Sequence, residues 1–227
     1  MTVDTPGWCG PPIIAGDWAE LEGAEALTMA YEIGAALDQR SELVNDVKVE
    51  RLRVLPLACY PGAILVEMQA RLGEQTGLSN HLYGPWGLVT LDGSSAPIHD
   101  INEIEGALSL RTEEEARAYH ALFCNTVRGD DGRFQTVAST ADLVWTAAPD
   151  DAVFAAITIG IEVRKTASGW EIESPIAYAG TMFVSRFELT RGGLIEMVDD
   201  QPVEDDLRIA RESWAVQFRI PPREDRE

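Results

Sequence analysis

Apolar and polar residues alternate along residues 154–198, and turn residues divide this stretch into short runs. The first run places four β-branched residues at alternate positions: Ile157, Ile159, Ile161 and Val163. Glycine-containing turns follow at 167–169 and 191–193. An alternation with period two is typical of strands that bury one face of a sheet. We therefore predict an antiparallel β-meander over 154–198, with a further strand at 214–220.

Two other segments show helical periodicity. Over 112–128, apolar or buried-type residues recur every three or four positions: Ala116, Tyr119, His120, Phe123, Cys124 and Val127. Thr112 and Glu115 have the spacing of a capping box, and three glutamates occupy the first turn. A second helix is predicted over 17–40, with Asp17 as its N-cap.

The segments between these helices are less regular. Residues 47–55 are β-branched and alternating, which predicts a strand. Residues 63–72 fit both a helix and a strand, and we favour the strand. Residues 73–87 have the composition of a long loop, and 88–91 that of a short strand before an Asp-Gly turn.

These elements predict an α+β fold, in which the antiparallel meander packs on the helix at 112–128. A helix against a curved meander is an arrangement also found in cystatin-like and nuclear-transport-factor-like folds, an analogy of layout only. We expect an irregular segment over 1–16, a single domain over 17–222 and a frayed tail over 223–227. A sub-boundary within 73–111 is the alternative to a single domain.

Charge limits the class of partner. The chain has 227 residues and a net charge of −20 at pH 7. Nucleic acids and anionic membranes attract Lys and Arg and repel carboxylates, so we expect neither as a partner. A basic protein is the better candidate.

The location and redox state follow from what the sequence lacks. Its apolar runs are too short to span a bilayer, and its first residues do not have the pattern of a secretion signal. The three cysteines, Cys9, Cys59 and Cys124, are widely spaced. This spacing predicts reduced thiols in a cytoplasmic protein.

An acidic run after the meander is the first candidate site. It contains Asp199, Asp200, Glu204, Asp205 and Asp206. The spacing does not match a calcium-binding loop, so we interpret the run as a surface for docking on Arg and Lys side chains. Tyr83 and Trp86, in the predicted loop, are candidate anchors for the same protein partner.

His120 and Cys124 lie four residues apart on one face of the predicted helix. They could form a thiolate–imidazole pair, but both also lie on the predicted core stripe, which favours burial. If a pocket instead opens between this helix and the meander, its candidate residues are Tyr119, His120, Cys124, Tyr178 and His99. Such a pocket would suit an enzyme or a protein that binds a small molecule.

Our leading hypothesis is a non-catalytic, acidic accessory module that docks on another protein. The sequence contains neither a nucleophile elbow nor a phosphate-binding loop, and we expect no cofactor and no metal. The alternative is the pocket-containing enzyme or binding protein. A third hypothesis is an inhibitor that imitates DNA through its carboxylates, possible only if they are spaced like phosphates along one surface.

Overall fold

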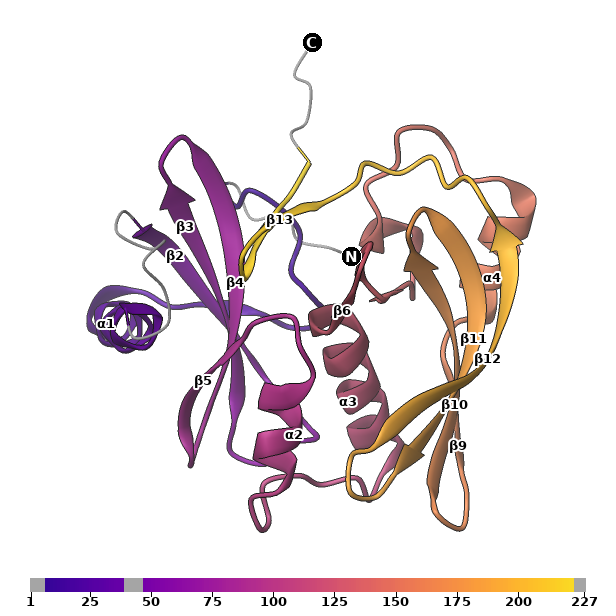
Figure 1. Cartoon of the computed structure of the whole chain (residues 1–227), viewed down its shortest axis with the longest axis horizontal. Helices are drawn as coiled ribbons and strands as arrows, with labels where there is room; N and C mark the ends of the chain where they lie inside the picture. Colours follow the sequence, from indigo (N-terminus) through magenta and orange to yellow (C-terminus); the bar gives the residue numbers. More distant parts are fainter. Residues whose placement is uncertain (1–6, 39–46, 223–227) are drawn as a thin grey trace. The chain divides into compact units, whose positions relative to one another are not determined.

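The computed structural model describes residues 7–38 and 47–222, drawn in colour in Figure 1. These residues form two compact units. The α1 unit comprises the described residues within Thr2–Leu57, Gly62–Asp92 and Glu212–Glu227. The α3 unit comprises Ala58–Pro61 and Gly93–Arg211. Residues 1–6 of the predicted irregular segment 1–16, the end of the predicted N-terminal helix beyond residue 38 and the predicted tail 223–227 lie outside the described residues.

The α1 unit is a seven-stranded antiparallel sheet with one helix. Its strands follow the order β1-β2-β3-β4-β14-β13, and β5 pairs with β4. The elements are β1 (Ala19–Glu20), α1 (Gly23–Asp38), β2 (Val47–Pro56), β3 (Ile64–Leu72), β4 (Gln75–Gly84), β5 (Gly87–Leu91), β13 (Ser213–Ala215) and β14 (Phe218–Ile220).

The alternation in β3 explains how this sheet is covered. Val66, Met68 and Ala70 are fully buried in a cluster with Met29 and Ile33 of α1. The intervening residues of β3 point to the opposite face of the sheet, because successive side chains in a strand alternate. Those between Ile64 and Ala70 are buried as well. Both faces of β3 are therefore covered, and the strand preferred for residues 63–72 is confirmed.

The α3 unit contains a five-stranded antiparallel sheet in the order β12-β11-β10-β8, with β9 paired to β10. Its helices are α2 (Ala96–Asn102), α3 (Glu113–Thr126), the short 3-10 helix η1 (Thr140–Asp142) and α4 (Asp151–Ile159). Its strands are β6 (Arg128–Gly129), β7 (Gly132–Arg133), β8 (Gln135–Thr136), β9 (Glu162–Lys165), β10 (Gly169–Tyr178), β11 (Thr181–Thr190) and β12 (Ile195–Glu204).

Helix α3 covers one face of this sheet. Its capping box is formed as predicted: the Thr112 hydroxyl accepts a hydrogen bond from Glu115 N, and the Glu115 carboxylate accepts one from Thr112 N. The ring of His120 packs edge-on against Phe187 of β11, and Trp170 of β10 donates a hydrogen bond to the carbonyl of Leu110. The α+β fold with an antiparallel meander packed on this helix is thus confirmed.

The opposite face of the same sheet carries α4 (Figure 1). Val153 and Ile157 of this helix pack with Ala177 of β10 and Met182 of β11. These two strand residues form a cross-strand pair. Because they alternate with the residues that face α3, α4 covers the opposite face of β10 and β11 where Ala177 and Met182 lie.

The strand predicted at the start of the meander is wrong: residues 151–159 form α4. Asp150 caps the helix by accepting a hydrogen bond from Val153 N, and Gly160, with φ of +75°, ends it. The buried residues Val153, Ala156 and Ile157 follow helical spacing. A short apolar run satisfies both periodicities, and here the caps favour the helix.

Three other expectations are corrected. The predicted loop 73–87 contains β4, a central strand whose polar residues Ser79, Asn80 and His81 are buried. The predicted strand at 214–220 is the hairpin of β13 and β14, which belongs to the α1 unit and not to the meander. The N-terminal helix begins at Gly23, because residues 19–20 pair with β2 and Asp17 therefore does not cap a helix.

Within the described residues, none of the helices combines the length and the apolar character needed to cross a membrane. The single domain expected over 17–222 stays a prediction. The division between the two units at Gly93 falls inside the sub-boundary region 73–111.

Candidate functional site

The predicted acidic run forms a surface at one edge of the α3 unit. Strand β12 ends the sheet, and in the described part of the chain it pairs with β11 alone. Helix α4 lies beside it and adds the carboxylate of its N-cap, Asp150. We call the following set the acidic surface: Asp150, Asp199, Asp200, Glu204, Asp205 and Asp206. All are exposed except Glu204, which is half-buried.

Like charges crowd around Glu204. Its pKa is raised, first by the charge of Asp150 and less by the charges of Asp205 and Asp206. Within residues 7–38 and 47–222, no Lys or Arg lies within ion-pair distance of these four carboxylates. Asp199 is different, because Arg186 Nη2 lies 3.8 Å from its Oδ2. The crowded end of the surface therefore carries negative charge that forms no ion pair within the described residues, although the Arg208 guanidinium lines the same hollow.

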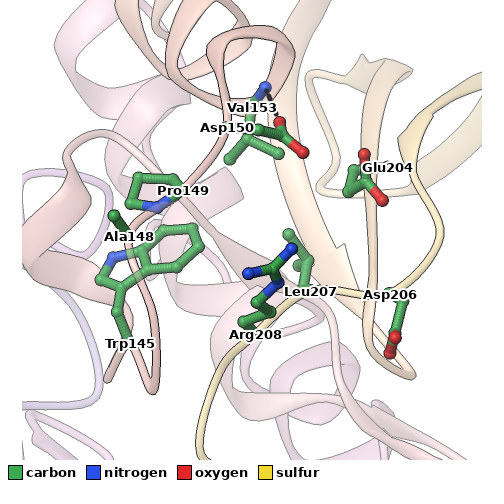
Figure 2. A pocket seen from close by; sticks show the side chains of 9 residues that line it. All are labelled: Trp145, Ala148, Pro149, Asp150, Val153, Glu204, Asp206, Leu207 and Arg208. Carbon is green, nitrogen blue, oxygen red and sulfur yellow. Dashed lines mark hydrogen bonds between the residues drawn. The ribbon is translucent and has the colours of Figure 1, made fainter.

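A hollow of about 160 Å³ opens beside Glu204. Figure 2 shows its lining residues: Trp145, Ala148, Pro149, Asp150, Val153, Glu204, Asp206, Leu207 and Arg208. The Trp145 ring is fixed by a hydrogen bond of 2.6 Å from its Nε1 to the carbonyl of Thr140. The Arg208 side chain lies between Trp145 and Leu207. The hollow thus combines an aromatic wall with three carboxylates and one guanidinium group.

The described residues contain no group of three or more His, Cys, Asp or Glu side chains placed to hold a metal ion. The carboxylates of the acidic surface therefore do not form such a group. What the arrangement offers chemically is a field of negative charge next to apolar walls, which suits a cationic group.

The predicted anchors Tyr83 and Trp86 belong to the α1 unit, whereas the acidic surface belongs to the α3 unit. They lie on the β4–β5 hairpin and not in a long loop. Tyr83 is half-buried against the core cluster of α1, and the Trp86 ring lies against Gly84. Part of each aromatic side chain therefore packs within its own unit.

The predicted pair His120 and Cys124 is buried on α3, where neither side chain reaches solvent. His120 Nε2 lies 3.2 Å from Ser174 Oγ of β10. Burial, with a smaller effect of the Arg117 charge, lowers the pKa of His120 to about 3. Burial also raises the pKa of the Cys124 thiol. A neutral imidazole and a protonated thiol at neutral pH do not form a thiolate–imidazole pair.

The other residues proposed for a pocket are held by hydrogen bonds or ring contacts. The Tyr119 hydroxyl donates to the carbonyl of Gly193 at 2.6 Å and accepts from Asn102 Nδ2 at 2.8 Å. The rings of His99 and Phe123 lie 6.0 Å apart. Tyr178 stacks on Phe134, and its hydroxyl accepts a hydrogen bond from Asp131 N. The hollow of the α3 unit has none of these residues in its lining.

Sequence reasoning missed a buried charge network in the α1 unit. Glu67, which is fully buried, accepts hydrogen bonds from Arg53 and from Arg219, whose Nη2 lies 3.2 Å from Glu67 Oε2. Arg219 also donates to Glu212 at 2.7 Å. Burial alone would lower the pKa of Arg219, but the charges of Glu212 and Glu67 reverse this effect and raise it. The available signal was a glutamate flanked by Val66 and Met68 in a mostly apolar strand.

In comparisons with known proteins, no family model, no curated protein and no solved structure matches this chain. Its function must therefore be argued from its own geometry.

Proposed function

We propose that this protein is a non-catalytic binding module that docks on a basic protein through the acidic surface of its α3 unit. The observation that carries the proposal is the crowding of Glu204 with Asp150, Asp205 and Asp206. Like-charged groups held together repel each other, and an approaching Arg or Lys side chain would relieve this repulsion.

The surroundings of the acidic surface add apolar contact area. Phe154 of α4 is 57% exposed, and Met197 and Val198 of β12 are each at least 40% exposed. Because α4 and β12 are neighbours in the same unit, a partner that touches the carboxylates can also cover apolar side chains. The partner we expect is a basic segment with interspersed apolar residues.

A competing explanation is that the carboxylates only protect an exposed sheet edge. Strand β12 has irregular register near Val198 and Val203 and contains Pro202. Bulges, proline and charge are common means of preventing edge-to-edge association. These interruptions also make main-chain pairing with a partner unfavourable, so the proposed contact is made by side chains.

The test compares two variants with the same change in net charge. The first carries Asp200→Asn, Glu204→Gln, Asp205→Asn and Asp206→Asn. The control carries four exposed glutamates replaced by Gln: Glu22, Glu74, Glu105 and Glu114. A labelled library of Arg- and Lys-rich peptides with embedded apolar residues is screened against the wild-type protein by fluorescence anisotropy. Hits are titrated against both variants at increasing salt.

We expect the first variant to lose at least about tenfold in affinity and the control to lose much less, because charge is screened beyond roughly 8 Å at physiological salt. Equal losses would mean that net charge alone matters. No peptide hit, together with self-association of the first variant in light scattering, would support edge protection and overturn the docking proposal.

A further inference from the structure

Residues 7–14 of the α1 unit, here called the strap, lie on the sheet face opposite α1. Hydrogen bonds between the main chain of the strap and side chains of the sheet attach it. Gln69 Nε2 donates to Gly7 O and Gln69 Oε1 accepts from Cys9 N. Arg53 donates to Gly10 O, and Arg219 donates to Pro11 O at 2.6 Å. Glu67 Oε2 accepts from Ile13 N at 3.0 Å.

The strap is held in the manner of a bound peptide ligand. Residues 7–14 form no strand pairing, so the side chains of the sheet bind their main chain. Ile13 and Ile14 are buried and provide two apolar anchors. The Trp8 ring lies 4.1 Å from the guanidinium of Arg53. Main-chain hydrogen bonds combined with apolar side-chain anchors are the usual elements of peptide recognition.

The polar groups under the strap are not explained by stability alone. Burying an ion pair costs desolvation energy, and well-packed apolar residues of similar volume are often equally or more stable. The register places Asn80 on the same face, because it pairs directly with Glu67. In the described part of the chain, two buried atoms of this face, Asn80 Oδ1 and Arg219 Nε, have no hydrogen-bond partner.

We infer that this face of the α1-unit sheet is a binding site for an extended polypeptide segment, and that the strap occupies it in cis. An amide or hydroxyl side chain in another segment could donate to Asn80 Oδ1 or accept from Arg219 Nε. Such a segment would form hydrogen bonds that the strap does not form. The expected ligand is an extended segment with two adjacent apolar residues and one Asn, Gln, Ser or Thr.

The first test uses the intact wild-type chain. If the strap is an exchangeable occupant, the amides of Cys9 and Ile13 exchange with deuterium through local opening. They should exchange at least about 100-fold faster than the amide of Met68 in β3. If all three amides exchange only with global unfolding, the strap is an integral part of the fold and the inference is wrong.

The second test weakens the strap in the full-length protein. In Gly10→Val, the new Cβ would lie 2.6 Å from Cγ of Pro221, so the strap or Pro221 must shift and the contact between them is weakened. The probe is a labelled peptide with the sequence of residues 7–18, with serine in place of Cys9, and its control is a scrambled peptide. The variant should bind the probe at least about tenfold more tightly than the wild type. A folded variant that binds neither peptide, or both equally, overturns the inference; if the variant does not fold, hydrogen exchange of the wild type decides.

Discussion

Glu204, at the end of β12, lies close enough to Asp150, the N-cap of α4, for the charge of Asp150 to raise the pKa of Glu204. Two acidic groups are therefore held together although each carries negative charge when ionised. The contact joins the edge of the sheet to the start of a helix, and it lies beside the hollow of the α3 unit.

This pair predicts a pH dependence of stability. Because the folded pKa of Glu204 is raised, its protonated form favours the native state. This contribution is complete below the unfolded pKa, near 4.5, and is lost as pH rises through the raised folded value. Glu204→Gln should therefore gain stability relative to wild type as pH rises through that window. Urea unfolding over a pH series checks this, and a constant difference between the two proteins would contradict it.

The two buried histidines predict the opposite dependence. Burial lowers the pKa of both His81 and His120 to about 3. Each stabilises the fold as a neutral group above pH 6.5, and this stability is lost as pH falls toward the folded value. Between pH 6.5 and 5, each histidine should lower the free energy of unfolding by about 1.4 kcal/mol for each unit by which the pH falls. His120→Gln should reduce the slope of unfolding free energy against pH by about half, and an unchanged slope in urea unfolding over a pH series would contradict this.

Core packing on α3 predicts which of two alanine substitutions destabilises the protein more. Leu122 is fully buried, whereas Phe123 is half-buried between the rings of Tyr119 and His99. Leu122→Ala should cost about 2–5 kcal/mol, and Phe123→Ala should cost less than the roughly 3–5 kcal/mol of a fully buried ring. Thermal or urea unfolding measures both. A larger loss for Phe123→Ala would mean that its ring, and not Leu122, fills the core.

The buried network predicts a large effect of a single charge. Glu67→Gln leaves Arg53 and Arg219 without their shared carboxylate, and the cost should be about 3–5 kcal/mol. The control is Glu50→Gln, which removes an ion pair to the exposed Arg71 and should cost less than about 1 kcal/mol. The difference in unfolding free energy between the two variants is the measurement. Equal costs would show that Glu67 is not effectively desolvated.

Local signals predicted several elements well. The capping box at Thr112 and Glu115 depends on residues three positions apart, and the structure forms it. The alternation in 63–72 likewise predicted β3, because its covered faces favour apolar residues. The stripe predicted for α3 was correct at Ala116, Tyr119, His120 and Cys124, but its Phe123 and Val127 are only half-buried. It omitted the buried residues Leu122, Asn125 and Thr126.

Other predictions failed where contacts between residues distant in sequence decide the secondary structure. Residues 75–84 have the composition of a loop, yet they form β4. The polar side chains of Ser79, His81 and Thr90 form hydrogen bonds with one another, with His81 between the other two. Polar residues can therefore lie in a central strand when a neighbouring strand supplies their partners. The sequence pattern alone does not contain that pairing.

The sequence by itself determined the α+β class, the capped helix α3 and the strong negative charge. Periodicity and capping depend on residues near one another in the sequence, and net charge depends only on the numbers of acidic and basic residues. The tertiary structure decided that residues 213–220 join the α1 unit, that Glu67 lies buried between Arg53 and Arg219, and that Asp150 reaches Glu204. Burial and electrostatic environment are set by residues from several distant segments, so they arise only when the chain is folded.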